Sequence, residues 1–196
     1  EAEGVLYGMR TPGDGTRRLC KINTSTGALT DVGTGTPTST SSSGSPSALD
    51  ATGNRFFFVG TPNGETDSRV FTFDTGATTG TGITASPTMT GTATSPILGL
   101  EYDPQEGVLY GIRSLAGARQ LVAINTGTGA VVALGAGTGV VVSSSGADAL
   151  DWARNRFFLA GQADGETSQR LYTFDTVDGS VDASPVIAGQ SVAMLY

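Results

Sequence analysis

The sequence predicts an all-β chain, and within that class a four-bladed β-propeller built by duplication of a two-blade unit. Three observations support this prediction: the second half repeats the first, each half repeats a shorter strand-and-turn pattern, and the C-terminal residues match a strand that the first blade lacks. Helical periodicity is absent, and the 29 glycines among 196 residues are typical of many short strands joined by turns.

The two halves of the chain are copies of one another. The sequence EGVLYGMR at residues 3–10 recurs as EGVLYGIR at residues 106–113, and NRFFF at residues 54–58 recurs as NRFFL at residues 155–159. The copies are offset by 103 and then 101 residues, so the second half duplicates the first with small insertions and deletions.

Each half divides again into two similar segments. Four stretches run from apolar residues into Asn or Asp followed by Thr, with a Gly shortly after; they are residues 19–24, 70–75, 121–126 and 171–176. Asn and Asp initiate turns, and Gly allows the positive φ that completes them, so each stretch is a strand that enters a hairpin. The mean segment length of about 49 residues is typical of a propeller blade.

A single domain spanning residues 1–196 then contains four expected blades, at residues 1–38 with 191–196, 39–90, 91–140 and 141–190. The third blade shows its strands most clearly, at residues 98–102, 108–113, 120–125 and 131–134. Stretches such as residues 121–124 are apolar at every position, as expected for sheets that are covered on both faces.

The two ends of the chain complete the expected ring. Residues 191–196 resemble residues 96–102, the innermost strand of the third blade, whereas the chain begins with the second strand of a blade at residues 4–7. We therefore expect the C-terminal strand to pair with the N-terminal blade and close the ring, because closure removes the exposed edges of an open one.

The repeated motifs carry a resemblance to a known superfamily. They are a Leu-Tyr-Gly strand at residues 6–8 and 109–111, followed by a strand ending Ile-Asn-Thr-x-Thr-Gly at residues 22–27 and 124–129. This pattern resembles the quinoprotein-like superfamily and related secreted bacterial propeller domains, over essentially the whole chain. The resemblance implies the fold. Quinone enzymes of that superfamily have larger rings with dedicated cofactor ligands that this sequence does not match, so it implies no cofactor and no catalytic residue.

Composition excludes several function classes. The formal charge of -7 and the pI near 4.4 argue against nucleic acid, and no apolar run is long enough for membrane insertion. The chain has no histidine and one cysteine, so we expect no transition-metal site and no histidine-activated nucleophile. Cys20 lies in an apolar stretch and is expected to be a buried, inert side chain. Abundant Ser, Thr, Gly and Ala with a single lysine indicate an extracellular, secreted protein.

Carboxylates are the remaining candidates for chemistry. Asp50, Asp103 and Asp151 occupy equivalent positions at the ends of the expected innermost strands. Near a propeller axis such a set could bind Ca²⁺, but Asp before a short turn is more often a residue that caps that turn, repeated because the blade is repeated. Glu101 and Asp148 are less regular and could face the mouth of the channel.

The candidate ligand-binding residues lie mainly in one hairpin loop of each half. They are Asn63, Glu65, Asp67 and Arg69 in the first half, and Asp164, Glu166 and Arg170 in the second. The Asn-Gly and Asp-Gly dipeptides are ordinary turn formers. The Glu and Arg of each loop are expected to form an ion pair that pins it; the alternative is a twofold-related pair of polar sites for a sugar or a peptide.

Trp152 completes the candidate set. It follows the innermost strand of the fourth blade, where the second blade has Ala51 and the third has Pro104. An unrepeated Trp near a turn could stack on a sugar ring or could fill space beneath the channel.

Three hypotheses for the function follow. The first is a non-catalytic extracellular binding module that presents polar loops to a carbohydrate or protein ligand. The second is a hydrolase or lyase, with or without Ca²⁺, in which Glu101, Asp103 and Asp151 would have to converge. The third is a structural surface protein that packs against identical copies, either as a homo-oligomer or as two chains in an eight-bladed ring; the first is equally compatible with a monomer.

Overall fold

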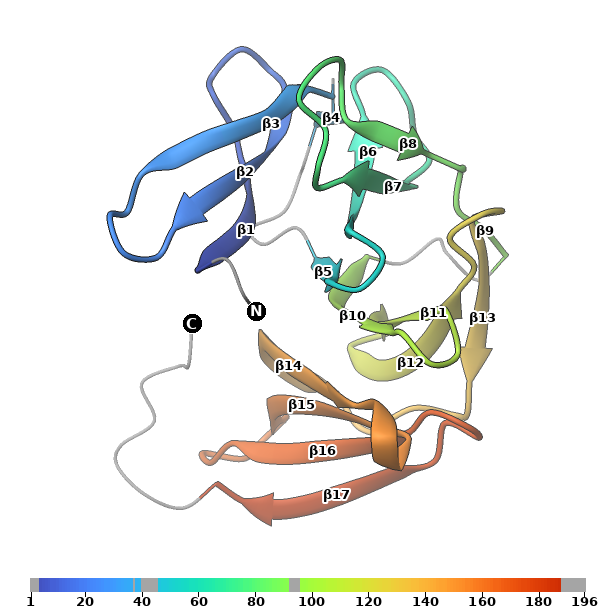
Figure 1. Ribbon diagram of the computed structural model, residues 1–196. Coiled ribbons are helices and arrows are strands. Elements are labelled where there is room, and N and C mark those ends of the chain that lie inside the picture. The colour runs from blue at the N-terminus through green and yellow to red at the C-terminus, as the bar shows by residue number, and fades with distance from the viewer. Residues whose placement is uncertain (1–3, 37, 40–45, 92–95, 188–196) are drawn as a thin grey trace. The chain divides into compact units, whose positions relative to one another are not determined.

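The computed structural model describes residues 4–36, 38–39, 46–91 and 96–187, with the backbone alone described at residues 38–39, 143–147 and 183–185. Strands dominate throughout (Figure 1). The helical content of the described ranges is a single 3₁₀ turn, η1 (Trp152–Arg154). None of the described segments forms a helix that could cross a membrane. The all-β prediction is therefore confirmed.

The first compact unit holds residues 1–89 together with 126–129. Its first sheet is antiparallel in the order β1 (Val5–Arg10), β2 (Arg17–Asn23), β3 (Leu29–Thr36). Its second sheet has the order β4 (Thr38–Ser39), β6 (Arg55–Pro62), β7 (Arg69–Asp74), β8 (Ile83–Ala85), and β5 (Ser47–Asp50) also pairs with β6.

The second unit holds residues 90–125 and 130–196. One sheet has the order β10 (Ile97–Asp103), β11 (Val108–Leu115), β12 (Ala118–Ile124), β13 (Ala130–Leu134), β9 (Thr90–Gly91), and the other has the order β14 (Val142–Asp151), β15 (Arg156–Ala163), β16 (Arg170–Asp175), β17 (Val181–Val186). Strands β10 to β13 match the four strands expected in the third segment to within two residues at every end.

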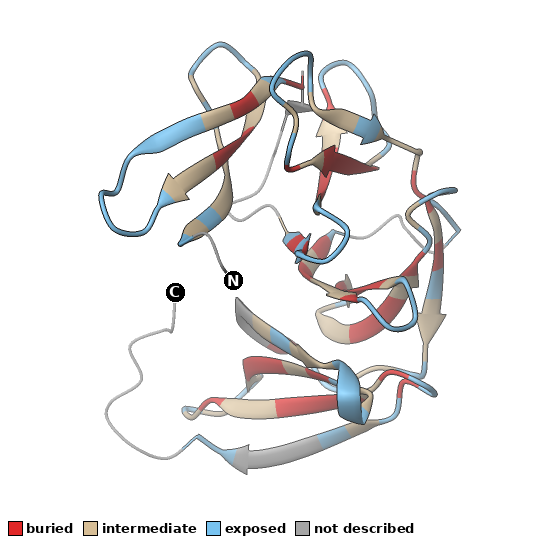
Figure 2. Ribbon diagram, in the orientation of Figure 1, coloured by how far each residue is buried: buried red, intermediate tan, exposed pale blue. Residues whose placement is uncertain are grey.

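Each unit contains its own apolar core, formed where its two sheets pack together (Figure 2). The first core consists of Leu19, Val32, Phe56, Phe58, Phe71 and Phe73. The second consists of Tyr110, Ile112, Leu121, Val142, Phe157, Leu159, Tyr172 and Phe174. Consecutive residues Leu121 and Val122 of β12 are both fully buried, so this strand is covered on both faces, as its apolar sequence predicts.

Cys20 belongs to the buried part of β2. Its Sγ lies 3.2 Å from the carbonyl oxygen of Gly8, and burial raises the pKa of the thiol above its ordinary value. Because the thiolate is the reactive form, the raised pKa makes this side chain inert. The prediction of a buried structural cysteine is confirmed.

Candidate functional site

Asp50, at the end of β5, organises the turn that follows it. One carboxylate oxygen accepts hydrogen bonds from the backbone N–H groups of Thr52 (3.2 Å) and Gly53 (2.9 Å) and from the Thr52 hydroxyl (2.7 Å). The other oxygen accepts two N–H bonds from Arg55, at 2.9 and 2.7 Å. The carboxylate is therefore fully committed to the turn, as the capping hypothesis predicts.

Asp103, at the end of β10, has the same role. Its Oδ1 accepts the backbone N–H groups of Gln105 (2.8 Å) and Glu106 (3.1 Å). The Glu106 carboxylate in turn accepts the hydroxyl of Tyr110 at 2.9 Å, which fixes this turn against β11. The capping hypothesis is confirmed here too.

Asp151 differs from Asp50 and Asp103, because its side chain makes no capping bond to the turn. Its Oδ2 instead pairs with Nη1 of Arg154 at 2.8 Å. The sequence explains the difference: Arg154 stands where the first half has Gly53, and a Cβ at Gly53 would collide with the Asp50 carboxylate. The arrangement of the first turn therefore cannot form in the second.

The backbone frames of the two turns nevertheless agree. Asn54 and Asn155 both adopt the left-handed conformation, at φ 52° and 54°. In both turns the carbonyl of this Asn accepts the N–H of a buried Thr, Thr75 or Thr176, at 2.9 Å. The two copies thus differ in the side chains that they present on one common frame.

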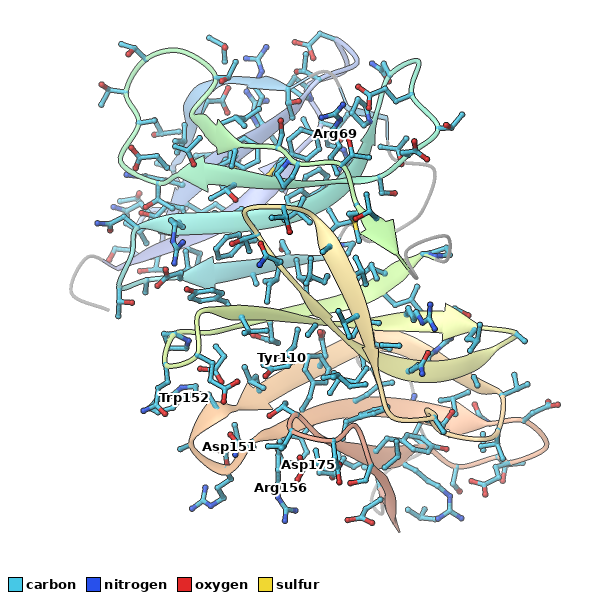
Figure 3. All side chains as sticks on the ribbon, turned by 90° about the vertical axis from the view of Figure 1, so that its right-hand side faces the viewer. Arg69, Tyr110, Asp151, Trp152, Arg156 and Asp175 are labelled. Carbon is cyan, nitrogen blue, oxygen red and sulfur yellow. The ribbon has the colours of Figure 1, made fainter. Side chains whose placement is uncertain are left out.

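The second turn presents an exposed aromatic ring beside exposed arginines. Trp152 is 41% exposed, and the Arg154 side chain is 75% exposed. Arg156 is exposed and makes no hydrogen bond or ion pair within the described residues, whereas its counterpart Arg55 is held by Asp50. Trp152, Asp151 and Arg156 gather at one end of the β14–β17 sheet (Figure 3). We call residues 151–156 the Trp152 turn.

The predicted Glu–Arg ion pairs of the two hairpin loops are confirmed. Nε of Arg69 lies 2.8 Å from Oε2 of Glu65, and Nε of Arg170 lies 2.7 Å from Oε2 of Glu166. The Arg170 guanidinium lowers the pKa of Glu166 by its hydrogen bond. These four charges hold their own loops, so they are not free to bind a ligand without breaking a pair.

The remaining loop candidates have different surroundings. Nδ2 of Asn63 donates to the carbonyl oxygen of Gly15 at 3.3 Å, which ties the β6–β7 loop to the β1–β2 loop of the same unit. Asp67 and Asp164 are exposed, and within the described ranges their carboxylates accept no hydrogen bond.

Trp152 and the loop at residues 163–170 do not form one site. Trp152 follows β14 at the end where Asp151 pairs with Arg156, and the loop lies at the other end of β15. The eight residues of β15 separate the two by roughly 24 Å at about 3.4 Å per residue. Our sequence analysis placed these residues in one candidate set. The sequence gives their identities but does not show at which end of the sheet each one lies.

The acidic residues also group differently from the expectation. Asp103 and Asp151 are committed to their turns, and the neighbour of Glu101 is Asp148. The hydrolase or lyase hypothesis requires Glu101, Asp103 and Asp151 to converge, and the structure instead places Asp148 near Glu101. Burial raises the pKa of Glu101 to about 7, with a further contribution from the charge of Asp148, and burial raises the pKa of Asp148 to about 6. Within the described residues, no group of three or more acidic, cysteine or histidine side chains could hold a metal ion.

No family model matches the chain, and no curated protein matches it. Among solved structures, it is similar to TolB from Acinetobacter baumannii, at 15% identity and a TM-score of 0.62 over 96% of this chain and 42% of that one. A protein of Agrobacterium tumefaciens described as a TolB matches at 12% identity and a TM-score of 0.64, over 97% of this chain and 64% of that one. A chain from the nidogen/laminin complex matches at 16% identity and a TM-score of 0.59, over 96% of this chain and 62% of that one.

The chain thus spans less than two thirds of each of these proteins. At such low identity the likeness concerns the fold and carries no activity. The narrower resemblance to the quinoprotein-like superfamily stays a prediction. Together with the all-β structure, the three matches establish that the chain has a β-propeller fold.

Proposed function

We propose that the chain is a non-catalytic extracellular binding module that contacts a carbohydrate through the Trp152 turn. The observation that carries the proposal is the exposure of Trp152. It is the sole tryptophan of the chain, it is 41% exposed, and it replaces the Ala51 of the duplicate turn. The substitution adds a large aromatic surface on a backbone frame that carries alanine in the other copy.

The chemistry of the Trp152 turn suits a sugar. Tryptophan side chains are largely buried in most proteins. An exposed ring keeps apolar surface in contact with water, which costs a free energy of about 25 cal/mol per Å². A pyranose has an apolar face that can cover such a ring, and hydroxyl groups that can accept from Arg156, which makes no hydrogen bond or ion pair within the described residues. A protein partner would need about 800 Å² with an apolar centre. The exposed neighbours Ala153 and Arg154 do not supply such a centre.

The carboxylates near the turn support binding without catalysis. Asp151 pairs with Arg154, and Asp175 accepts the backbone N–H of Val177 at 2.8 Å. A hydrolase or lyase would have to use Glu101 and Asp148 instead. Two further hypotheses from the sequence, Ca²⁺ binding in the channel and assembly through identical copies, stay predictions.

The four-bladed, closed form of the propeller is part of this proposal. Within the described residues, β1 has a partner on one side alone, β2, whereas β11, its copy in the second half, lies between β10 and β12. Residues 191–196 (SVAMLY) lie outside the described residues; because they resemble residues 97–102 (ILGLEY), we propose that they occupy the free edge of β1. Closure would make the propeller a rigid frame for the Trp152 turn.

The fluorescence of Trp152 tests the proposed function directly, because no other tryptophan contributes to the signal. Purified protein is titrated with cellopentaose, xylopentaose, laminaripentaose and trigalacturonate. We expect a saturable change in emission with at least one of them, and no release of reducing ends during prolonged incubation.

Calorimetry then compares variants. Trp152→Ala should weaken binding at least tenfold. Arg170→Gln removes one positive charge at the opposite end of the same sheet and should leave the affinity unchanged. Equal affinity of Trp152→Ala and wild type, or no response to any sugar, would overturn the proposal; binding of a protein from the same source with no sugar response would replace it.

A further inference from the structure

Two carboxyl groups meet in the second unit where β10 packs against β14. The Asp148 carboxylate lies directly over Gly99 of β10, so closely that a Cβ at Gly99 would collide with its Oδ2. The backbone N–H of Leu100 also interacts with this carboxylate. The side chain of Asp148 thus reaches from its own strand onto the backbone of the neighbouring one.

Glu101 projects onto the same face of β10. The pairing of Gly99 with Ile112, of Leu100 with Gly111 and of Glu101 with Tyr110 is uninterrupted. Alternate residues of a regular strand point to one face, so Glu101 follows Gly99 on that face at roughly 7 Å along the strand. Because Asp148 covers Gly99, its carboxylate is the neighbour of Glu101, and the two charges interact.

Neither carboxyl group has a countercharge within the part of the chain that the structure describes. Oδ2 of Asp148 is buried and has no hydrogen-bond partner within the described residues. Those residues include every lysine and arginine of the chain, and none forms an ion pair with Glu101 or Asp148. Opposite Glu101, β11 presents Tyr110, whose hydroxyl donates to Glu106; opposite Asp148, β15 presents Leu159.

We propose that Glu101 and Asp148 form a proton-binding site that joins β10 to β14, in which the two carboxyl groups share one proton. A carboxylic O–H on one residue donates to the carboxylate of the other and satisfies the buried oxygen. When that proton passes to water, two neighbouring anions remain and repel each other across the junction. The pair is therefore a pH-sensitive clasp that acidic conditions close.

The direction of the pH effect follows from the raised pKa values. The pKa of Glu101 is raised to about 7 and that of Asp148 to about 6, both chiefly by burial. Unfolded carboxyl groups titrate near pH ~4. The folded state thus holds its protons more tightly, so the stabilisation is complete below about pH 4 and is lost as the pH rises to about 7.

Other copies of the repeat supply replacements for both residues. Asp148 pairs with Leu159 as Ser47 pairs with Phe58, so Ser is its counterpart. In the resemblance between residues 97–102 and 191–196, the counterpart of Glu101 is Leu195. The variants Asp148→Ser and Glu101→Leu therefore introduce side chains that the other copy of the repeat already carries.

Thermal melts between about pH 3.5 and 8 test the clasp in wild type, Glu101→Gln, and the double variant Glu101→Leu/Asp148→Ser. We expect the melting temperature of wild type, relative to the double variant, to fall by roughly 4–8 °C from pH ~4 to pH ~7. Glu166→Gln removes an acid whose pKa is lowered, so it should leave this fall intact. Parallel curves for wild type and the double variant would overturn the proposal.

Infrared spectroscopy gives a second readout that does not depend on thermal unfolding. A protonated carboxyl band should persist at about pH 5.5, where ordinary carboxyl groups are ionised, and the double variant Glu101→Leu/Asp148→Ser should remove it. Absence of the band in wild type would also overturn the shared proton.

Discussion

Strands β1 and β11 have almost the same sequence and very different surroundings. Leu6 of β1 is 59% exposed, whereas its copy Leu109 in β11 is fully buried. A Cβ at Gly8 would meet nothing within 4 Å, but one at Gly111 would lie 3.1 Å from the carbonyl oxygen of Gly99 on β10. The burial of this motif is therefore supplied by the strand beside it rather than by the motif itself.

Truncation of the chain after Gln190 is the change with the largest expected effect on the comparison between β1 and β11. If residues 191–196 cover β1 as β10 covers β11, their removal exposes β1 and also Val192, Met194 and Leu195. Each fully buried large apolar side chain contributes about 1.5–3 kcal/mol. The loss would consume much of a typical stability of about 5–15 kcal/mol. We expect the shortened chain to be insoluble or to melt far below the full chain.

Thermal melts of the two chains decide between closure and an unpaired C-terminal segment. The latter predicts almost no change in the melting temperature. An unchanged midpoint would mean that residues 191–196 do not cover β1, and the closed ring of the proposed function would be wrong with it.

The two duplicated turns give a second comparison, between Asp50 and Asp151. The Asp50 side chain is 2% exposed and accepts five hydrogen bonds, including two from Arg55. Among the described residues, the Asp151 side chain pairs with the exposed Arg154 alone. We expect Asp50→Ala to lower the free energy of unfolding by about 3 kcal/mol, because it removes five hydrogen bonds to a buried carboxylate. Asp151→Ala should change it little. Urea unfolding of both variants measures the difference, and equal losses would contradict the assigned roles.

The Asp50 carboxylate should also cause part of the loss of stability at low pH. Burial acts to raise the pKa of this carboxyl, but the bonds from Gly53, Thr52 and Arg55 outweigh it, and the net shift is downward. Its stabilising contribution is present above the unfolded value near pH ~4 and is lost as the pH falls through the lower folded value. The pH dependence of this contribution is opposite in sign to that of Glu101 and Asp148. Wild type should therefore be most stable between the pH range in which the Asp50 contribution is lost and the range in which the Glu101–Asp148 contribution is lost.

Local patterns in the sequence predicted those features that depend on neighbours along the chain. The strands β10 to β13, the turn-capping role of Asp103 and the Glu65–Arg69 pair all follow from spacing within one hairpin. The meeting of Glu101 with Asp148 could not be predicted in this way, because it depends on how two sheets pack. The different role of Asp151 could in principle have been predicted from the sequence, because Arg154 replaces the Gly that the first turn requires.

The smallest expected effect concerns the loop pairs, where the two halves agree most closely. Arg69 and Arg170 each bind a Glu four residues earlier, but Arg69 also donates from Nη1 to the carbonyl oxygen of Ser86 at 2.9 Å. Exposed ion pairs contribute little and are screened by salt. We therefore expect Arg170→Gln to lower the melting temperature slightly, and this loss to vanish in 1 M salt. Arg69→Gln should keep part of its loss at high salt, because a hydrogen bond to a carbonyl is screened less than an ion pair. Identical salt dependence of the two variants would show that the Ser86 contact adds nothing, and that the two loops are equivalent in energy as well as in sequence.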